Sequence, residues 1–256
     1  MEWTDTALVL SLGRFREIDV WLRLLTHRHG IVHVFAFGGS RSRKRFPGCL
    51  DMLNLLRIRV DTGRTGQFPT LCEASLVWGP RSLRTGGSRL GMAMNCLRFL
   101  EALGLPQDDA GEALTLTQSL LTLLEGDAAV PETLPILFRL RLASGQGYVP
   151  SFARCSACGA PLGFNEGDTA GEDAFWSVPE GAVRCPRCAA GKGQRSQGRL
   201  TPAMLRALAT VQDAPPECWG HDGLTAHERQ DCARYIDEFV QYHLGLVWDR
   251  GRFGKV

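Results

Sequence analysis

Two pairs of cysteines have the spacing of zinc knuckles: Cys155-Ser156-Ala157-Cys158 and Cys185-Pro186-Arg187-Cys188. Two such turns bring four thiolates to the corners of a tetrahedron, an arrangement that Zn²⁺ favours. The 26 residues between the pairs exceed the usual ribbon spacing, so the connecting loop carries an insertion. A four-cysteine set leaves no open coordination position. The sequence therefore predicts one structural zinc ion (Zn2+) and no metal-based catalysis.

Two other roles for these cysteines compete with metal binding. Disulfides are disfavoured because nothing in the chain suggests export, and cytosolic thiols stay reduced. A redox role needs only one Cys-x-x-Cys motif on a βα unit, so it does not explain two. The remaining five cysteines stand singly and are predicted to be small buried hydrophobes: Cys49, Cys72, Cys96, Cys218 and Cys232.

Composition and length are those of an ordinary globular protein. The 256 residues are 44% hydrophobic and 22% charged, enough for a sizeable core and two or three units. Charged residues within the first 25 positions argue against a signal peptide, and no apolar run reaches the ~18 residues of a membrane helix. We expect a soluble cytoplasmic protein without a membrane partner.

The net charge of +2 conceals an uneven distribution along the chain. Residues 1–89 hold 14 Lys and Arg against 7 Asp and Glu, a net charge of +7, whereas residues 90–150 carry a net charge of −4. A basic first third followed by an acidic middle suggests that one end of the protein binds a polyanion.

Residues 6–78 show the patterns of five short strands. Val20, Leu22 and Leu24 alternate with polar or amphipathic neighbours, the period of two that a half-buried strand requires. The other runs are Thr6 to Leu12, Ile31 to Phe37, Leu53 to Val60 and Leu71 to Val77. Short strands without a long helix favour a small closed barrel, because closure removes exposed strand edges. An OB-type β-barrel is the first prediction and an SH3-like barrel the second.

A basic loop separates the third and fourth predicted strands. Arg41, Arg43, Lys44 and Arg45 lie within five residues, flanked by glycines, and would repel one another without a nearby polyanion. Phe46 follows them and is predicted to stack on an unpaired base. A solvated loop is the alternative, but the barrel context favours DNA binding. Further candidates for this surface are Arg14, Arg16, Arg81 and Arg84.

From residue 88 onward the apolar period becomes helical. Helices are predicted near 88–104, 111–125 and 132–143, and again after Thr201-Pro202 and after the capping box Thr225 to Glu228. The predicted organisation is α+β: an N-terminal OB-type β-barrel DNA-binding domain at 1–80, then an α-helical domain at 81–150 and 197–256. An inserted zinc finger with four cysteine ligands occupies 151–196.

No catalytic constellation is present. The chain lacks a phosphate-binding Gly-x-x-x-x-Gly-Lys loop and a dinucleotide fingerprint, and no His-x-Glu precedes the cysteines as a zinc deaminase requires. An acidic group between the cysteine pairs is typical of a mobile solvated loop: Glu166, Asp168, Glu172 and Asp173. We therefore predict that the protein is not an enzyme.

Four stretches, in this order, resemble the RecO family of bacterial recombination mediators. They are Ala7-Leu8-Val9-Leu10 with Glu17-x-Asp19 and Leu24-Leu25-Thr26-x-x-x-Gly30; Gly39-Ser40-Arg41-x-x-x-Arg45-Phe46; Phe138 to Leu142 leading to Gly147-Tyr148-Val149-Pro150; and Cys155-x-x-Cys158-Gly159 with Phe175 to Ser177 and Cys185-x-x-Cys188. The chain departs from the family in its long acidic inter-knuckle loop and at Gly181-Ala182, where two glycines are often found.

The resemblance implies a role in DNA repair and homologous recombination through the RecFOR pathway, near the nucleoid. It implies binding to single- and double-stranded DNA, annealing of complementary strands, and help in loading RecA onto strands coated by single-strand-binding protein. The implied partners are RecR and the C-terminal tail of that coating protein, which we expect to dock on the helical domain near Arg139 or Arg141. The alternative is a zinc-ribbon protein-interaction scaffold without direct DNA binding.

Overall fold

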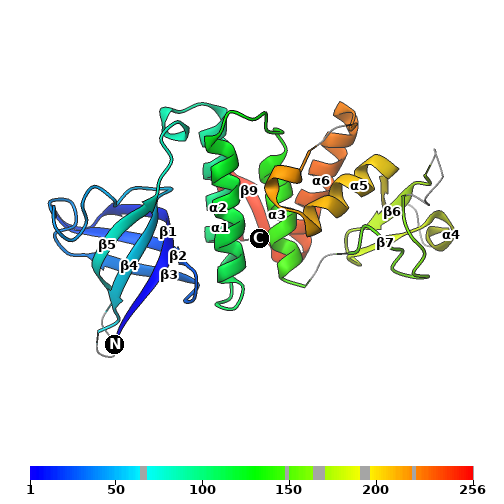
Figure 1. Cartoon of the computed structure of the whole chain (residues 1–256). Coiled ribbons are helices and arrows are strands. Elements are labelled where there is room, and N and C mark those ends of the chain that lie inside the picture. Colours follow the sequence, from blue (N-terminus) through cyan, green and yellow to red (C-terminus); the bar gives the residue numbers. More distant parts are fainter. Residues whose placement is uncertain (64–67, 148–149, 164–170, 191–196, 221–222, 256) are drawn as a thin grey trace. The chain divides into compact units, whose positions relative to one another are not determined.

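A computed structural model describes residues 1–63, 68–147, 150–163, 171–190, 197–220 and 223–255 (Figure 1). Tyr148, Val149, Glu166 and Asp168 of the sequence motifs lie outside this range. The chain forms two compact units, Met1–Asp127 and Ala128–Val256. No helix in the described part of the chain is long and apolar enough to cross a membrane.

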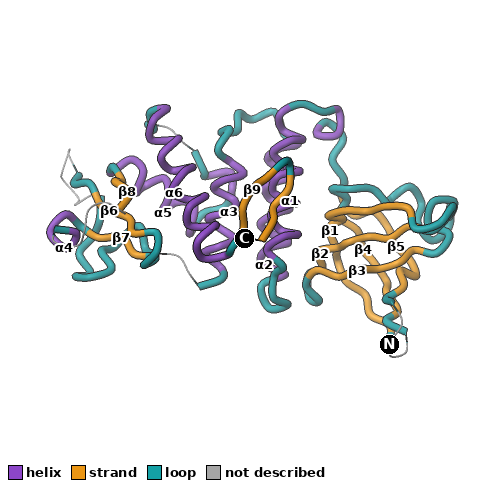
Figure 2. Tube along the Cα trace, turned by 180° about the vertical axis from the view of Figure 1, so that it is seen from behind, coloured by secondary structure: helices purple, strands orange, loops and turns teal. Residues whose placement is uncertain are grey.

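The first unit contains a closed five-stranded barrel. Its strands are β1 (Glu2–Arg14), β2 (Val20–Thr26), β3 (Ile31–Ala36), β4 (Leu55–Asp61) and β5 (Thr70–Trp78), in the order β1-β2-β3-β5-β4. Antiparallel pairing of β1 with β4 closes the ring, and β3 meets β5 in the parallel sense (Figures 1 and 2). All five predicted strands and the predicted OB-type barrel are confirmed.

Apolar side chains at every second position of β2 and β4 contribute to the barrel core. Val20, Leu22 and Leu24 of β2 are buried, as are Ile58 and Val60 of β4, which accords with the predicted inward faces. The positions between these residues, such as Arg23, Arg57 and Arg59, are at least partly exposed, so on β2 and β4 the charged side chains lie on the outer surface of an apolar barrel core.

The 3₁₀ turn η1 (Leu83–Thr85) and two helices complete the first unit: α1 (Ser88–Leu103) and α2 (Ala110–Glu125). Gly104 ends α1 in the left-handed conformation at φ 65°, as predicted from the sequence. These helices contact β1 and β2, and Arg23 of β2 donates to the carbonyl oxygen of Glu101 at 3.0 Å. The helices α1 and α2 thus fall in the same compact unit as the barrel, whereas the sequence predicts that residues 81–150 belong to a helical domain. The predicted division into three domains, with boundaries at residues 80, 150 and 197, stays a prediction.

The second unit is built on three helices: α3 (Leu134–Gly145), α5 (Pro202–Asp213) and α6 (Ala226–Leu244), with the 3₁₀ turn η3 (Pro216–Cys218) before α6. The Thr201 hydroxyl accepts from the N–H of Met204 at the start of α5. Thr225 and Glu228 form the capping box that opens α6, and Gly245 ends it. Both predicted starts are therefore confirmed.

The cysteine region forms a small sheet of β6 (Ala174–Ser177), β7 (Ala182–Arg184) and β8 (Gln197–Leu200), with the short helix α4 (Pro186–Ala189). Trp176 of β6 is fully buried and packs 5.7 Å from Phe239 of α6 between ring centroids. A closing hairpin of β9 (Leu246–Asp249) and β10 (Arg252–Lys255) was not predicted.

Glu125, the last residue of α2, holds the turn that follows the barrel. Its carboxylate accepts the backbone N–H groups of Arg81, Ser82 and Leu83, each at 2.8 Å. Burial opposes ionisation, but these three donors outweigh it and lower the pKa of Glu125.

We expect Glu125→Gln to destabilise the protein by about 1–2 kcal/mol at pH 7, since charged acceptors form the stronger hydrogen bonds. The pKa is lower in the folded state than in the unfolded chain. The difference between variant and wild type is therefore complete at neutral pH. It begins to shrink below the usual glutamate pKa of about 4.3 and is lost as pH falls through the lower pKa of folded Glu125. Thermal denaturation at neutral pH and in acid measures the stability difference between variant and wild type. The control is Glu112→Gln, at an exposed carboxylate. A difference that persists unchanged in acid would contradict it.

Candidate nucleic-acid interface and metal centre

The connection between β3 and β4, residues 37–54, carries the four predicted DNA-binding cations. Arg41, Arg43, Lys44 and Arg45 are all exposed. Among the residues that the structure describes, no carboxylate forms an ion pair with any of them. Four neighbouring positive charges that no described carboxylate neutralises form a surface suited to a polyanion.

Buried side chains anchor this basic loop to the barrel. Phe46 is 2% exposed and Cys49 fully buried, and both belong to the barrel core. The N–H of Ala74 on β5 donates to the carbonyl oxygen of Arg45 at 3.0 Å. The prediction that Phe46 stacks on a base is therefore wrong: its ring fills the core, and it fixes the neighbouring cations in place.

The start of the loop is fixed by a second contact that sequence reasoning missed. Asp19, buried at the end of the β1–β2 connection, accepts the N–H of Gly38 at 2.7 Å. Gly38 has φ 66°, a conformation that favours glycine, and the N–H of Ser40 donates to the carbonyl oxygen of Ile18 at 3.1 Å. The Gly38-Gly39 pair was the available sequence signal. The basic loop and the β1–β2 connection are thus joined.

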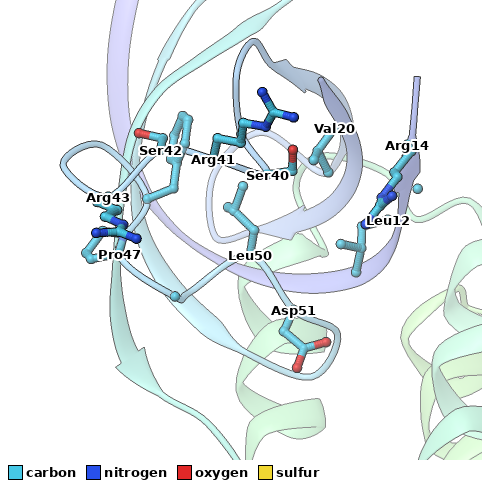
Figure 3. A pocket seen from close by; sticks show the side chains of 14 residues that line it. Leu12, Arg14, Val20, Ser40, Arg41, Ser42, Arg43, Pro47, Leu50 and Asp51 are labelled. Carbon is cyan, nitrogen blue, oxygen red and sulfur yellow. The ribbon is translucent and has the colours of Figure 1, made fainter. Parts of the chain in front are cut away.

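A groove of about 1050 Å³ lies between the basic loop and the end of β1 (Figure 3). Arg14 of β1 lines one side of this groove, and Arg41 and Arg43 of the basic loop line the opposite side. Apolar lining comes from Leu12 and Leu50. The structure therefore brings Arg14 together with the basic loop in one groove, and the role of both in DNA binding stays a prediction. Arg16 is exposed on the β1–β2 connection, its guanidinium 5.3 Å from the Phe15 ring centroid.

Arg84 has a structural role instead of the predicted DNA contact. Its Nε donates to the carbonyl oxygen of Pro80, and its Nη2 donates to Asn54 Oδ1 at 2.7 Å. Its Nη1 pairs with Asp51, the one carboxylate among the described lining residues of the groove. This pairing neutralises Asp51 and leaves the groove positive. Arg81, in contrast, is exposed and stays a predicted contact.

The four knuckle cysteines converge in the second unit. The Sγ atoms of Cys155, Cys158, Cys185 and Cys188 all lie within 4.8 Å of one another, and none forms a disulfide. The Sγ atoms of Cys158 and Cys185 are 3.9 Å apart. A tetrahedral ion with metal–sulfur bonds of about 2.3 Å places its sulfurs roughly 3.8 Å apart. The cluster fits a metal ion.

Backbone N–H groups prepare the cluster for a cation. Burial raises the pKa of Cys155, but donation from the N–H groups of Cys185, Cys158 and Ala157 outweighs this and lowers it to about 6. The Cys185 N–H lies 3.4 Å from the Cys155 sulfur. Hydrogen bonds with Cys158 and Cys185 raise the pKa of Cys188 to about 12, so metal binding there displaces a proton.

The remaining predictions for cysteines and acidic residues have mixed outcomes. Cys49, Cys96 and Cys232 are buried as predicted, but Cys72 is half-buried and Cys218 is exposed. Asp173 forms an ion pair with Arg199 of β8 at 2.6 Å, so this part of the inter-knuckle segment is tied to the sheet.

Fold and sites together define an α+β protein with an OB-type barrel, a basic groove and a cluster of four cysteines that could hold a metal ion. Family models for the Recombination protein O N-terminal and C-terminal regions match residues 1–79 and 84–252. The chain is 45% identical to the DNA repair protein RecO of Nitratidesulfovibrio vulgaris and 43% identical to that of Lawsonia intracellularis, over the full length of each. The chain belongs to the RecO family of DNA repair proteins.

We expect Phe46→Ala to lower the free energy of unfolding by about 3–5 kcal/mol, because it opens a cavity in the barrel core. Phe68→Ala, which truncates a ring that is 73% exposed, should change it by less than about 0.5 kcal/mol. Urea denaturation compares the two. Equal stability of both variants and wild type would show that Phe46 does not anchor the loop.

We expect Cys185→Ser to abolish stoichiometric metal binding and to lower the melting temperature, since structural metal binding contributes on the order of 10–16 kcal/mol in isolated fingers. The control is Cys218→Ser, an exposed thiol outside the cluster. Elemental analysis of anaerobically purified protein provides the measurement. Less than about half an equivalent of metal in the wild type would refute a closed four-thiolate site.

Proposed function

We propose that this protein is a recombination mediator that binds single- and double-stranded DNA and anneals complementary strands. It also helps to load RecA onto strands coated by single-strand-binding protein. Membership in the RecO family supports the DNA-repair role. We place its action in the cytoplasm, near the nucleoid.

The observation that carries DNA binding is the anchored basic loop. Its four cations lie on a fixed segment, next to a groove whose single described carboxylate is already paired with Arg84. Phosphates along a DNA strand match such a row of cations, and phosphate contacts are independent of base sequence. Annealing follows from the same feature, because two mutually repelling strands approach more readily over a shared cationic surface.

The metal in the cysteine cluster is proposed to be zinc, in a structural role. Four thiolates suit Zn²⁺ and leave no position for a substrate or water. Such an ion would hold the two knuckles and the sheet of β6, β7 and β8 together. It supplies no chemistry to a reaction, and we propose that the protein is not an enzyme.

RecR and the acidic C-terminal tail of single-strand-binding protein are the proposed protein partners. The structure changes one detail of the predicted tail site. Arg139 is buried, forms an ion pair with Asp237, and lies 4.8 Å from the Phe253 ring centroid. Its guanidinium is therefore not available to a carboxylate of the tail, and the half-buried Arg141 is the remaining candidate of the two.

Replacing Arg41, Arg43, Lys44 and Arg45 by alanine tests DNA binding. Affinity should fall about equally for every sequence. The slope of log affinity against log salt on single strands should become shallower by roughly 2–3, at about 0.7 for each phosphate that the variant no longer neutralises. Stability should change little, because exposed charges contribute little to it.

The matched control removes three arginines and one lysine from exposed positions of the second unit: Arg187, Arg250, Arg252 and Lys255. This variant has the same net charge as the loop variant. If both variants change the salt slope equally, the effect is one of net charge, and the basic loop is not the DNA site. An unchanged slope in the loop variant would also refute the proposal.

A further inference from the structure

Four phenylalanines form a surface cluster on the barrel. Phe15, Phe37 and Phe68 are 53%, 47% and 73% exposed, and Phe35 is half-buried among them. The Phe35 ring lies 5.3 Å from that of Phe15, 6.4 Å from that of Phe37 and 5.2 Å from that of Phe68, between centroids. We call these residues the phenylalanine surface.

This cluster draws its members from three separate segments. Phe35 lies on β3 and Phe37 follows that strand, while Phe15 is in the β1–β2 connection and Phe68 precedes β5. The Phe35 N–H donates to the carbonyl oxygen of Pro69 at 2.9 Å, which holds the Phe68 segment against β3. Large apolar side chains gathered and exposed in this way mark a binding surface more often than a chance arrangement.

The position of the phenylalanine surface suits an oligonucleotide. In OB-type barrels the connections β1–β2 and β4–β5, together with the face of β2 and β3, bind single strands. Phe15 and Phe68 lie on those two connections. Trp21 of β2 pairs directly with Phe35 in the strand register, so a further aromatic side chain points to the same face.

Cations border the phenylalanine surface and connect it to the basic loop. The Arg16 guanidinium lies near the Phe15 ring, and Arg45 donates from Nη2 to the carbonyl oxygen of Phe37. A polar protein partner would not need four adjacent rings, and a purely apolar one would not need the cations. Phosphates with exposed bases satisfy both features.

From these contacts we infer that the phenylalanine surface stacks unpaired bases of single-stranded DNA whose phosphates lie on the basic loop. The inference rests on the proposed DNA binding and assigns separate roles to the cations and to the aromatic rings. The cations bind any DNA backbone, and the rings favour single strands, because bases paired within a duplex do not expose their faces.

The test is the double variant Phe37→Ala with Phe68→Ala, which removes two exposed rings. Its affinity is measured for a mixed-sequence single strand, for an abasic strand of equal length, and for a duplex. Affinity for the single strand should fall about tenfold or more, while binding to the abasic strand and the duplex changes less than about twofold. The salt slope should stay unchanged, because every cation that meets a phosphate is still present.

Two further variants sharpen the result. Phe37→Trp with Phe68→Trp should retain single-strand affinity, since any aromatic face can stack. Leu76→Ala, at an apolar side chain of β5 that is 53% exposed, should have no effect. An equal loss on all three DNA probes, or no loss on the single strand, would overturn the inference; in the second case a protein partner would be the alternative occupant. Wild-type protein that binds no DNA would instead refute the proposed function.

Discussion

Burial of Phe46 and Cys49 in the barrel core is the constraint on which the proposed DNA-binding surface depends. Four neighbouring cations repel one another and would spread apart on a free loop. Burial of a Phe side chain contributes roughly 1.5–3 kcal/mol, which offsets a repulsion that water and salt already weaken. The basic loop is therefore anchored to the barrel at Phe46 and Cys49, and the proposed binding of DNA would require little further ordering of its backbone there.

Sequence patterns predicted those elements whose signals are local. Alternation with a period of two or short apolar runs identified all five barrel strands, and the capping box Thr225 to Glu228 set the start of α6. The buried side chains of that helix recur at the helical period: Cys232, Tyr235, Ile236, Phe239 and Val240. Each of these signals depends on neighbours within one or two turns, so a single sequence contains it.

Long-range contacts explain the errors. Phe46 follows four cations in the sequence, which predicts an exposed side chain, but closure of the barrel places its ring in the core. Arg84 and Arg139 are bound by side chains that lie far away in the sequence, those of Asn54 and Asp237. The phenylalanine surface joins β3 to two loops that carry no periodic signal. Such contacts exist only once the topology is complete, and pattern reasoning does not reach them.

Crosslinking tests the central claim, that the barrel of the first unit holds the DNA, most directly. A single strand carrying photoreactive bases is irradiated with the full-length protein, and the modified peptides are identified by mass spectrometry. We predict crosslinks within residues 13–21 and 35–48, which contain the basic loop and most of the groove lining and of the phenylalanine surface. Crosslinks confined to residues 128–256 would contradict the account.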